Sequence, residues 1–290
     1  MNLPDVSIIG TGALGSALAC ALQKKDFSVK SVYNRTHAKS RALAKELGIP
    51  IWGAFPEKPE ETGSLIILTV PDDSIATAAE NLSVLHDDWS GYAVIHCSGS
   101  LPSSALSVLQ QKGAKTAAFH PLQTFTEASS LHSFTGVYFS IEGDSDLLEI
   151  LRELAKRLEA HTLEITPSAK GYLHAAAVMA SNYLIALLHA AEQIARLGGI
   201  DDTGQTRNAL LPLIRQSLEN AGRGELSDAL SGPVARGDSG TVRKHLAMLE
   251  PESGLLLLYK LLGQQALDLA KQKGTLEPEQ ISELEKLLST

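Results

Sequence analysis

The stretch Asp5-Val6-Ser7-Ile8-Ile9-Gly10-Thr11-Gly12-Ala13-Leu14-Gly15 decides the fold of this 290-residue chain. An apolar strand pattern leads into a Gly-x-Gly-x-x-Gly motif, and a helical pattern follows, which is the context that a dinucleotide-binding turn requires. Gly10 permits the tight turn, Gly12 lets a pyrophosphate approach the backbone, and Gly15 lets the helix pack closely on the strand. We therefore expect the phosphates to bind at this helix N-terminus, against Gly10, Thr11, Gly12, Ala13, Leu14 and Gly15.

Apolar runs and amphipathic stretches alternate through the first half of the chain. Strands are predicted over residues 6–9, 28–33, 65–70, 93–96, 116–119, 137–141 and 163–165. Helices are predicted between them, over residues 13–24, 38–47, 74–85, 103–111 and 147–158. The early strands are almost continuously apolar, which is typical of a parallel sheet covered on both faces. The pattern predicts a Rossmann-type α/β domain with a doubly wound parallel sheet.

The pattern changes after residue 165, where no further strand is predicted. Helices are predicted over residues 168–197, 202–221, 239–249, 254–273 and 278–288. Thr166-Pro167 is a favourable helix start, because proline is tolerated in the first turn. We therefore expect an α/β domain over residues 1–165 and an all-helical domain over residues 166–290.

The end of the second predicted strand indicates which dinucleotide binds. An NAD site keeps an acidic residue about 20 residues after the glycines, for the ribose hydroxyls, and this chain has Tyr33-Asn34-Arg35-Thr36 there. Asn34 can bond a ribose without repelling a phosphate, and the guanidinium of Arg35 can clamp a 2′-phosphate. We therefore expect NADP(H) as the cofactor, with Asn34, Arg35 and Thr36 around its phosphate. The alternative for Arg35 is an ordinary solvated charge.

Later strand ends are expected at the same edge of the sheet, where open α/β sheets bind ligands. Small residues there leave room for a nicotinamide ring, so Val70, Pro71 and Ser98 are expected to contact the cofactor. His96 and Ser98 are also expected to contact the substrate. His120 follows another apolar strand and is a candidate for the catalytic site, although it could simply cap the strand.

With these residues in view, the chain resembles the NADP-dependent reductases related to pyrroline-5-carboxylate reductase and deazaflavin-dependent NADP reductase. It looks most like a branch with a Rossmann-like domain and a helical C-terminal domain of unknown function. The resemblance rests on residues 96–99, 120–125, 170–176, 180–183 and 232–238. It implies an NADP(H)-dependent oxidoreductase whose helical domain is similar to that of 6-phosphogluconate dehydrogenase. A lysine on the long helix transfers protons in such enzymes, but the motif around Lys170 differs from theirs.

Polar side chains recur on one face of the long predicted helix. Lys170, His174 and Ser181 are four and seven residues apart, which brings them onto one face, with Asn182 at its edge. We expect Lys170 or His174 to protonate a carbonyl or imine substrate as hydride arrives, with Asn182 orienting it and Ser181 binding it. The alternative is that Lys170 begins the helix in solvent and His174 is a satisfied core histidine.

A second group of polar residues precedes the helix predicted over 239–249. Arg236 beside a helix N-terminus is a reasonable receptor for a substrate carboxylate or phosphate. The alternative is that an Arg236–Asp238 pair ties the loop down. The histidines show no paired i,i+4 spacing and no interleaved carboxylates, so no metal site is expected.

Composition sets the remaining expectations. The net charge of −8, without a basic block, argues against a nucleic-acid binder. The start of the chain runs directly into a strand, so we expect a cytoplasmic protein. Residues 171–191 lack charge, but the polar residues among them favour the central helix of a large core over a membrane span. Surplus apolar surface in the helical half predicts a homodimer. A non-catalytic NADP(H)-binding regulator is the alternative to an enzyme acting on a small substrate.

Overall fold

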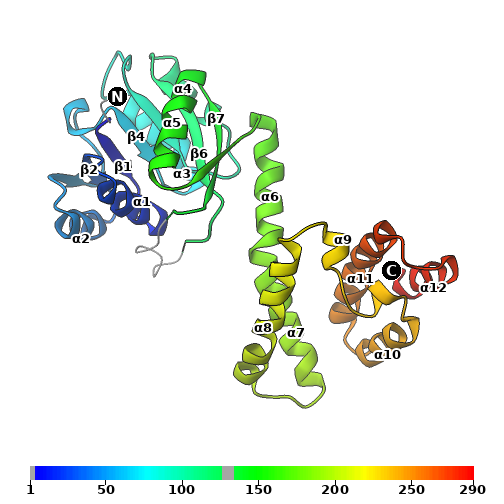
Figure 1. Cartoon of the computed structure of the whole chain (residues 1–290). Coiled ribbons are helices and arrows are strands. Elements are labelled where there is room, and N and C mark those ends of the chain that lie inside the picture. Colours follow the sequence, from blue (N-terminus) through cyan, green and yellow to red (C-terminus); the bar gives the residue numbers. More distant parts are fainter. Residues whose placement is uncertain (1–3, 126–133) are drawn as a thin grey trace. The chain divides into compact units, whose positions relative to one another are not determined.

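The computed structural model describes residues 4–125 and 134–290, and the chain separates into two compact units, residues 1–181 and 182–290. The first unit is built on one eight-stranded sheet with the order β3-β2-β1-β4-β5-β6-β7-β8 (Figure 1). Its strands are β1 (Val6–Ile9), β2 (Val29–Tyr33), β3 (Ile51–Gly53), β4 (Leu65–Leu68), β5 (Ala93–His96), β6 (Lys115–Pro121), β7 (Tyr138–Gly143) and β8 (His161–Glu164). Because consecutive strands step outward from β1 in both directions, the predicted doubly wound topology is confirmed.

Helices cover both faces of this sheet. Side chains of α1 (Ala13–Lys24), α2 (His37–Leu47) and α5 (Ser145–Arg157) share one buried cluster with the sheet. Side chains of α3 (Asp72–Ser83) and α4 (Ser107–Gln110) share a second cluster, which also holds Trp89. Two short 3-10 helices, η1 (Pro59–Glu61) and η2 (Ser103–Leu106), complete the connections. Covering on both faces explains why the central strands are almost entirely apolar.

Two features of the sheet depart from the predicted pattern. The short strand β3 was not predicted, since it has only three residues and its central Trp52 is largely exposed. β6 and β7 pair antiparallel, with His120 opposite Ser140 and Ala118 opposite Glu142, whereas the other strand pairs are parallel. The antiparallel step matters for the site, because it brings Glu142 beside the loops at the carboxyl end of β5.

The long helix predicted over residues 168–197 is interrupted. A short 3-10 helix, η4 (Pro167–Ala169), leads into α6 (Lys170–Ala180), and α7 (Asn182–Leu197) starts after Ser181. Ser181 has φ −118° and ψ −72°, which lies outside helical geometry. The division between the two compact units falls here, whereas the last strand, β8, ends at Glu164.

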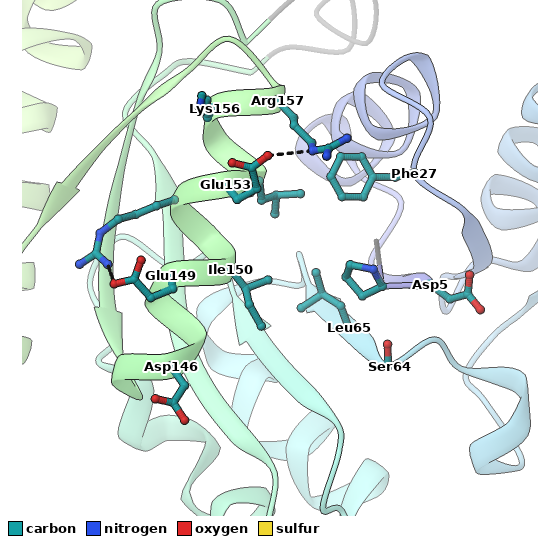
Figure 2. Close-up of a pocket in the computed structure, with 13 residues that line it drawn as sticks. Asp5, Phe27, Ser64, Leu65, Asp146, Glu149, Ile150, Glu153, Lys156 and Arg157 are labelled. Atoms are coloured by element: carbon teal, nitrogen blue, oxygen red, sulfur yellow. Dashed lines mark hydrogen bonds and ion pairs between the residues drawn. The ribbon is translucent and has the colours of Figure 1, made fainter. Parts of the chain in front are cut away.

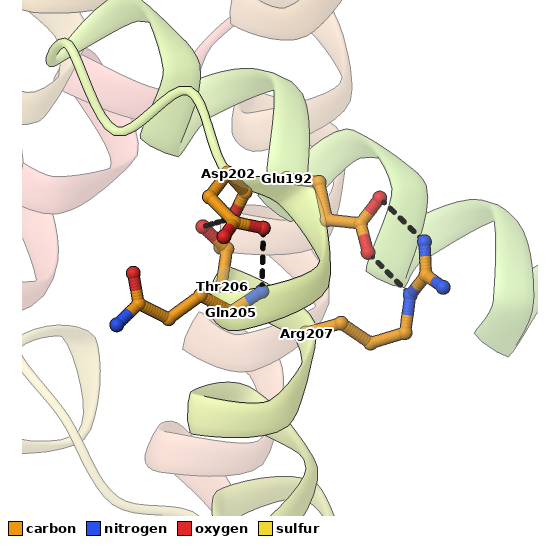
Figure 3. Close-up of polar contacts among 5 residues, drawn as sticks. All are labelled: Glu192, Asp202, Gln205, Thr206 and Arg207. Atoms are coloured by element: carbon orange, nitrogen blue, oxygen red, sulfur yellow. Dashed lines mark hydrogen bonds and ion pairs between the residues drawn. The ribbon is translucent and has the colours of Figure 1, made fainter.

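The second unit consists of helices. They are α7, α8 (Thr203–Ala221), α9 (Leu226–Ala229), η5 (Val234–Arg236), α10 (Ser239–Leu249), α11 (Ser253–Lys273) and α12 (Pro278–Leu288). Its small buried core lies on η5 and α10 to α12, and consists of Val234, Val242, Leu267, Leu284 and Leu288. Figure 3 shows how α7 and α8 are joined, since both carboxylate oxygens of Glu192 accept hydrogen bonds from Arg207 and Asp202 caps α8.

The expectation that residues 171–191 are buried in the chain's own core is wrong. The segment Pro167–Leu197 is the one helical stretch of the described chain that is long and apolar enough to cross a membrane, and only 6% of its most apolar window is buried. The buried core of the second unit lies on η5 and α10 to α12, and the stretch buries only Lys170 of α6 and Ala190 and Glu192 of α7. Length and composition of one such helix are weak evidence for a membrane span.

Candidate functional site

The glycine turn between β1 and α1 has the sterics that its sequence predicts. Gly10 has φ +109°, and a Cβ there would lie 2.7 Å from the backbone of Thr69. A Cβ on Gly15 would lie 1.8 Å from the carbonyl oxygen of Gly10, so these two glycines are required for packing. A Cβ on Gly12 would meet nothing within 4 Å, which leaves that backbone open to an approaching group. Thr11 Oγ1 is buried without a hydrogen-bond partner in the described chain.

A groove of about 750 Å³ starts at this turn. It is lined from the carboxyl ends of β1, β2, β3 and β4, where ligands of open α/β sheets bind. Of the predicted cofactor residues, the lining includes Gly10, Gly12, Ala13, Leu14, Asn34, Arg35, Val70 and Pro71. Sequence reasoning missed the lining residues Ala54, Phe55, Thr77 and Asn81, which carry no motif, and it gave Phe125 of the motif 120–125 no role at the cofactor. Thr11, Gly15, Thr36 and Ser98 are not part of the lining.

A larger hollow of about 1090 Å³ lies at the opposite end of the strands (Figure 2). It opens beside α5, where Ile150 and Leu65 form an apolar floor and Glu153 pairs with Arg157 at the rim. Asp5 and Ser64, which line this hollow, come just before β1 and β4. The hollow therefore lies at the amino ends of these strands, away from the glycine turn at their carboxyl ends. Its size therefore does not make it the site.

Basic side chains gather at the β2 end of the groove. Arg35 is exposed, and His37, Lys39 and Arg41 follow it on the first turns of α2, with no acidic residue before Glu46. The Oδ1 atom of Asn34 accepts the amide N–H of Thr36 at 2.9 Å, so its amide group remains as the donor facing outward. Cations and a helix N-terminus suit a phosphate at this position.

The other end of the site is a short loop after β5. We define it as residues 97–103, so that it ends at Ser103, the first residue of η2. Ser98 Oγ donates to Asp72 Oδ2 at 2.8 Å, and Ser100 Oγ donates to the same oxygen at 2.7 Å. Asp72 lies between Pro71 and Asp73, which both line the groove, so this loop adjoins the groove. The functional role of Asp72 was missed, because an acidic residue in a first helical turn is typical of ordinary helices.

His96 is fully buried and serves this loop. Its Nδ1 accepts the amide N–H of Ser98 at 3.2 Å, and its Nε2 lies 3.1 Å from the carbonyl oxygen of Pro102. Burial lowers the pKa of His96 to about 4, so the ring is neutral at pH 7 and its proton sits on Nε2. Since both nitrogens are engaged, His96 holds the loop and is not placed to touch a substrate.

Lys170 also reaches the loop from α6. Its ammonium is completely buried (0% exposed), and Nζ donates to the carbonyl oxygen of Ser98 at 3.1 Å. Burial lowers the pKa of Lys170, while the negative charges of Glu142 and Asp72 partly offset this. The alternative that Lys170 begins its helix in solvent is therefore wrong. Glu142 was not predicted, because a glutamate in a short strand gives no sequence signal.

Two imidazoles enclose Gly99 of the same loop. The rings of His120 and His174 lie edge to face, with centroids 6.0 Å apart. A Cβ on Gly99 would lie 2.5 Å from His174 Nδ1 and 2.9 Å from His120 Nε2. Nδ1 of His174 is buried and has no hydrogen-bond partner in the described residues. Burial, followed by the positive charges of Lys170 and His174, lowers the pKa of His120 to about 4.

The remaining predicted residues lie at or beyond the division between the units. Ser181 ends the first unit, whereas Asn182 and Arg236 belong to the second. Arg236 is exposed at the end of η5, and no ion pair joins it to Asp238, whose carboxylate instead caps α10 through Thr241. The structure thus brings His120, Lys170 and His174 together around Ser98, and roles for Asn182 and Arg236 stay predictions.

Comparisons with known proteins agree with this architecture. Residues 3–121 match the family described as a Rossmann-like domain, and residues 137–266 match the domain of unknown function DUF2520. No curated protein matches the sequence significantly. A solved structure from Thermotoga maritima is 25% identical, with a TM-score of 0.73 over 93% of this chain and 99% of that one.

Further solved structures share the fold at lower identity. A Bacteroides fragilis protein, described as a candidate NADP oxidoreductase, is 24% identical over 91% of this chain and 98% of that chain, with a TM-score of 0.69. The Aspergillus terreus reductive aminase in complex with NADPH is 17% identical over 99% of this chain and 100% of that chain, with a TM-score of 0.64. Imine reductases and a pyrroline-5-carboxylate reductase also match, which confirms the predicted resemblance. The chain therefore consists of a Rossmann-like domain followed by a DUF2520 domain.

Proposed function

We propose that this protein is an NADP(H)-dependent oxidoreductase that transfers hydride between nicotinamide C4 and a small carbonyl or imine substrate. The observation that carries the proposal is that Asp72, between two residues that line the groove, bonds the loop that packs against His120 and His174. The groove begins at the glycine turn and passes Pro71. The next residue, Asp72, bonds Ser98, and Gly99 beside it lies against the imidazoles of His120 and His174. The solved neighbours in complex with NADPH share this fold, which supports the cofactor assignment.

The strand order sets the direction in which the dinucleotide would lie. Arg35 and Asn34 at the end of β2 would hold the 2′-phosphate and ribose, and the turn after β1 would hold the pyrophosphate. Gly12 offers open space to the phosphates. Val70 and Pro71, after β4, and Ser98, after β5, would then lie towards the nicotinamide end. When bound, the cofactor supplies or accepts the hydride.

The chain itself must supply the proton that accompanies the hydride. His174 and His120 are partly exposed at the cluster, and the free Nδ1 of His174 is directed at Gly99. In reduction, His174 would donate a proton to the oxygen or nitrogen of the substrate as the C–H bond forms, whereas His120, neutral at pH 7, would orient the substrate. Lys170 adds a positive charge that stabilises the developing negative charge. Asn182, Ser181 and Arg236 remain the proposed substrate-orienting groups.

Turnover by a His174→Ala variant tests this proposal. NADPH oxidation with a panel of small keto acids and cyclic imines is expected to slow about 100-fold or more, since general acid catalysis contributes that much. NADPH affinity should be unchanged, because His174 does not line the groove. His161→Ala, an exposed histidine on β8, serves as the control and should keep full activity.

The same assay separates the enzyme from the regulator. If the wild-type protein binds NADPH tightly but turns over no member of the panel, the oxidoreductase proposal fails and a non-catalytic NADP(H)-binding regulator is favoured. If His174→Ala retains wild-type turnover, the proposed role of the histidine is wrong even though the cofactor assignment stands.

We also propose that a second copy of the chain covers α7 and α8. Large apolar residues are exposed on these helices, including Tyr183, Ile185, Leu197, Leu213 and Leu218. Few charged residues lie among them on α7 and α8. Monomeric proteins rarely expose apolar surface on this scale. A closed dimer would bury this surface.

Light scattering on purified protein tests the dimer. A mass of twice 30.9 kDa is expected for the wild type. Ile185→Glu with Leu213→Glu should shift the mass to the monomer, since unpaired buried charges destabilise an interface. A wild-type monomer, or recovery of the protein only in the membrane fraction, would contradict the proposal.

A further inference from the structure

We infer that Lys170 and Glu142 are positioning residues for the loop 97–103, and that Lys170 acts through this loop rather than by donating its proton to the substrate. The inference rests on the proposed function, because it concerns how the same site controls the proton. It also assigns a role to Glu142, a residue outside every motif of the sequence.

The first observation is the location of the Lys170 ammonium. The side chain is completely buried, and its Nζ donates to the Ser98 carbonyl oxygen at 3.1 Å. A proton donor must come within about 3 Å of the substrate atom that receives the proton. Because the ammonium is buried against the backbone of the loop, the structure presents none of its surface to a bound molecule. His174 and His120, on the other side of Gly99, keep part of their surface exposed.

The second observation is how Glu142 holds the far end of the same loop. Its carboxylate is buried (2% exposed), accepting the Ser103 amide N–H at 2.6 Å and the Ser103 hydroxyl at 2.8 Å. A buried carboxylate is expensive unless it is bonded and balanced by opposite charge. Lys170 provides the balancing charge, since Glu142 is the strongest opposite charge acting on this lysine. Both side chains bind the loop, Lys170 at Ser98 and Glu142 at Ser103.

A third group fixes the loop from the groove side. The Asp72 carboxylate accepts the hydroxyls of Ser98 and Ser100. Asp72 therefore holds the loop at Ser98 and Ser100. Lys170 holds it at Ser98, and Glu142 holds it at Ser103. Gly99 lies within the segment held in this way and contacts both imidazoles. A displacement of the loop would therefore change the positions of His120 and His174.

Lys170 also affects the charge of His120. Four ionisable groups act on this imidazole: Lys170, His174 and His96 lower the pKa of His120, and Asp72 raises it. Burial lowers the pKa of His120 more than any of these charges does. Burial and the four charges together hold this pKa at about 4, so the ring stays neutral at pH 7. Removing the positive charge of Lys170 must move this pKa upward, because a neighbouring cation disfavours the imidazolium.

Two variants of the full chain test the inference, Lys170→Met and Glu142→Gln, with NADPH bound. The NMR titration of His120 in Lys170→Met should move upward by about one pH unit, and Lys170→Arg should restore it towards the wild-type position. With the best substrate of the panel, kcat should fall about 10-fold in Glu142→Gln, as expected for misplaced groups, while KM changes little. If kcat falls at alkaline pH because the proton donor loses its proton, that fall should persist in Lys170→Met, since Lys170 is not the donor.

The contrary results are equally specific. If the fall in kcat at alkaline pH disappears in Lys170→Met and added methylammonium restores turnover, Lys170 is the proton donor and the inference is overturned. An unchanged His120 titration in Lys170→Met would also overturn it. Should Lys170→Met fail to fold, Ser103→Ala removes only one hydroxyl contact with Glu142, and wild-type kcat in both this variant and Glu142→Gln would contradict the positioning role.

The His120 titration distinguishes this inference from the proposed function. It requires folded protein and NADPH but no turnover. If no substrate of the panel is reduced, the oxidoreductase proposal fails, and the titration still decides whether Lys170 acts on His120.

Discussion

Replacing Gly99 by alanine is expected to lower kcat/KM about 100-fold or more while leaving NADPH affinity unchanged. The new Cβ would lie 2.5 Å from His174 Nδ1 and 2.9 Å from the His120 ring, so the imidazoles or the loop must move. Misplacement of reacting groups by about 1 Å costs on this order. The cofactor groove does not include Gly99, so binding of NADPH should be retained. Steady-state NADPH oxidation and a fluorescence titration measure the two effects.

Gly171 provides the matched control for this substitution. It lies in α6, next to Lys170, and a Cβ there would meet nothing within 4 Å. Gly171→Ala should therefore keep wild-type turnover and be slightly more stable, because alanine favours helix. Equal turnover of the Gly99→Ala and Gly171→Ala variants would show that the contact of Gly99 with the imidazoles does not matter for the reaction.

An Arg35→Ala variant should bind NADPH about 10- to 100-fold more weakly and bind NADH as the wild type does. The guanidinium lies exposed at the β2 end of the groove, where only NADPH would present a 2′-phosphate. A hydrogen bond to a charged group contributes about 1.5–3 kcal/mol, which corresponds to this range. Calorimetric titrations of the variant and the wild type with each coenzyme give the loss of affinity for NADPH and for NADH directly.

Lys45 is the control for the loss of one positive charge. It lies in the last turn of α2, on the same helix that begins beside Arg35. Lys45→Ala should reduce NADPH affinity little, because exposed charges far from the phosphate are screened by salt. If Arg35→Ala weakens NADPH and NADH equally, the assignment of the 2′-phosphate to Arg35 is incorrect.

Most of the fold could be predicted from the sequence, because local patterns and tertiary packing agree along the central strands. β1, α1 and β5 have the predicted bounds, since a buried parallel strand must be apolar and the glycine turn fixes where α1 begins. β3 could not be predicted, because three residues with an exposed Trp52 give no periodicity. The antiparallel pairing of β6 with β7 depends on tertiary contacts that strand patterns do not encode.

The candidate site was less accessible to sequence reasoning. His120, Lys170 and His174 were selected because polar groups on apolar elements need partners, and the structure brings all three to one loop. The partners themselves, Asp72 and Glu142, are recognised only from distances, since acidic residues are common in helices and strand ends. The burial of Lys170 likewise depends on how α6 packs against the loop, which no spacing along the chain reveals.

Calorimetric titration of the wild-type protein with NADPH, and separately with NADH, tests the central claim most directly. One NADPH is expected to bind per chain, at least about tenfold more tightly than NADH, as expected for the loss of one charge-assisted contact. No binding heat for either coenzyme up to about 1 mM, with protein shown to be folded, would contradict the account.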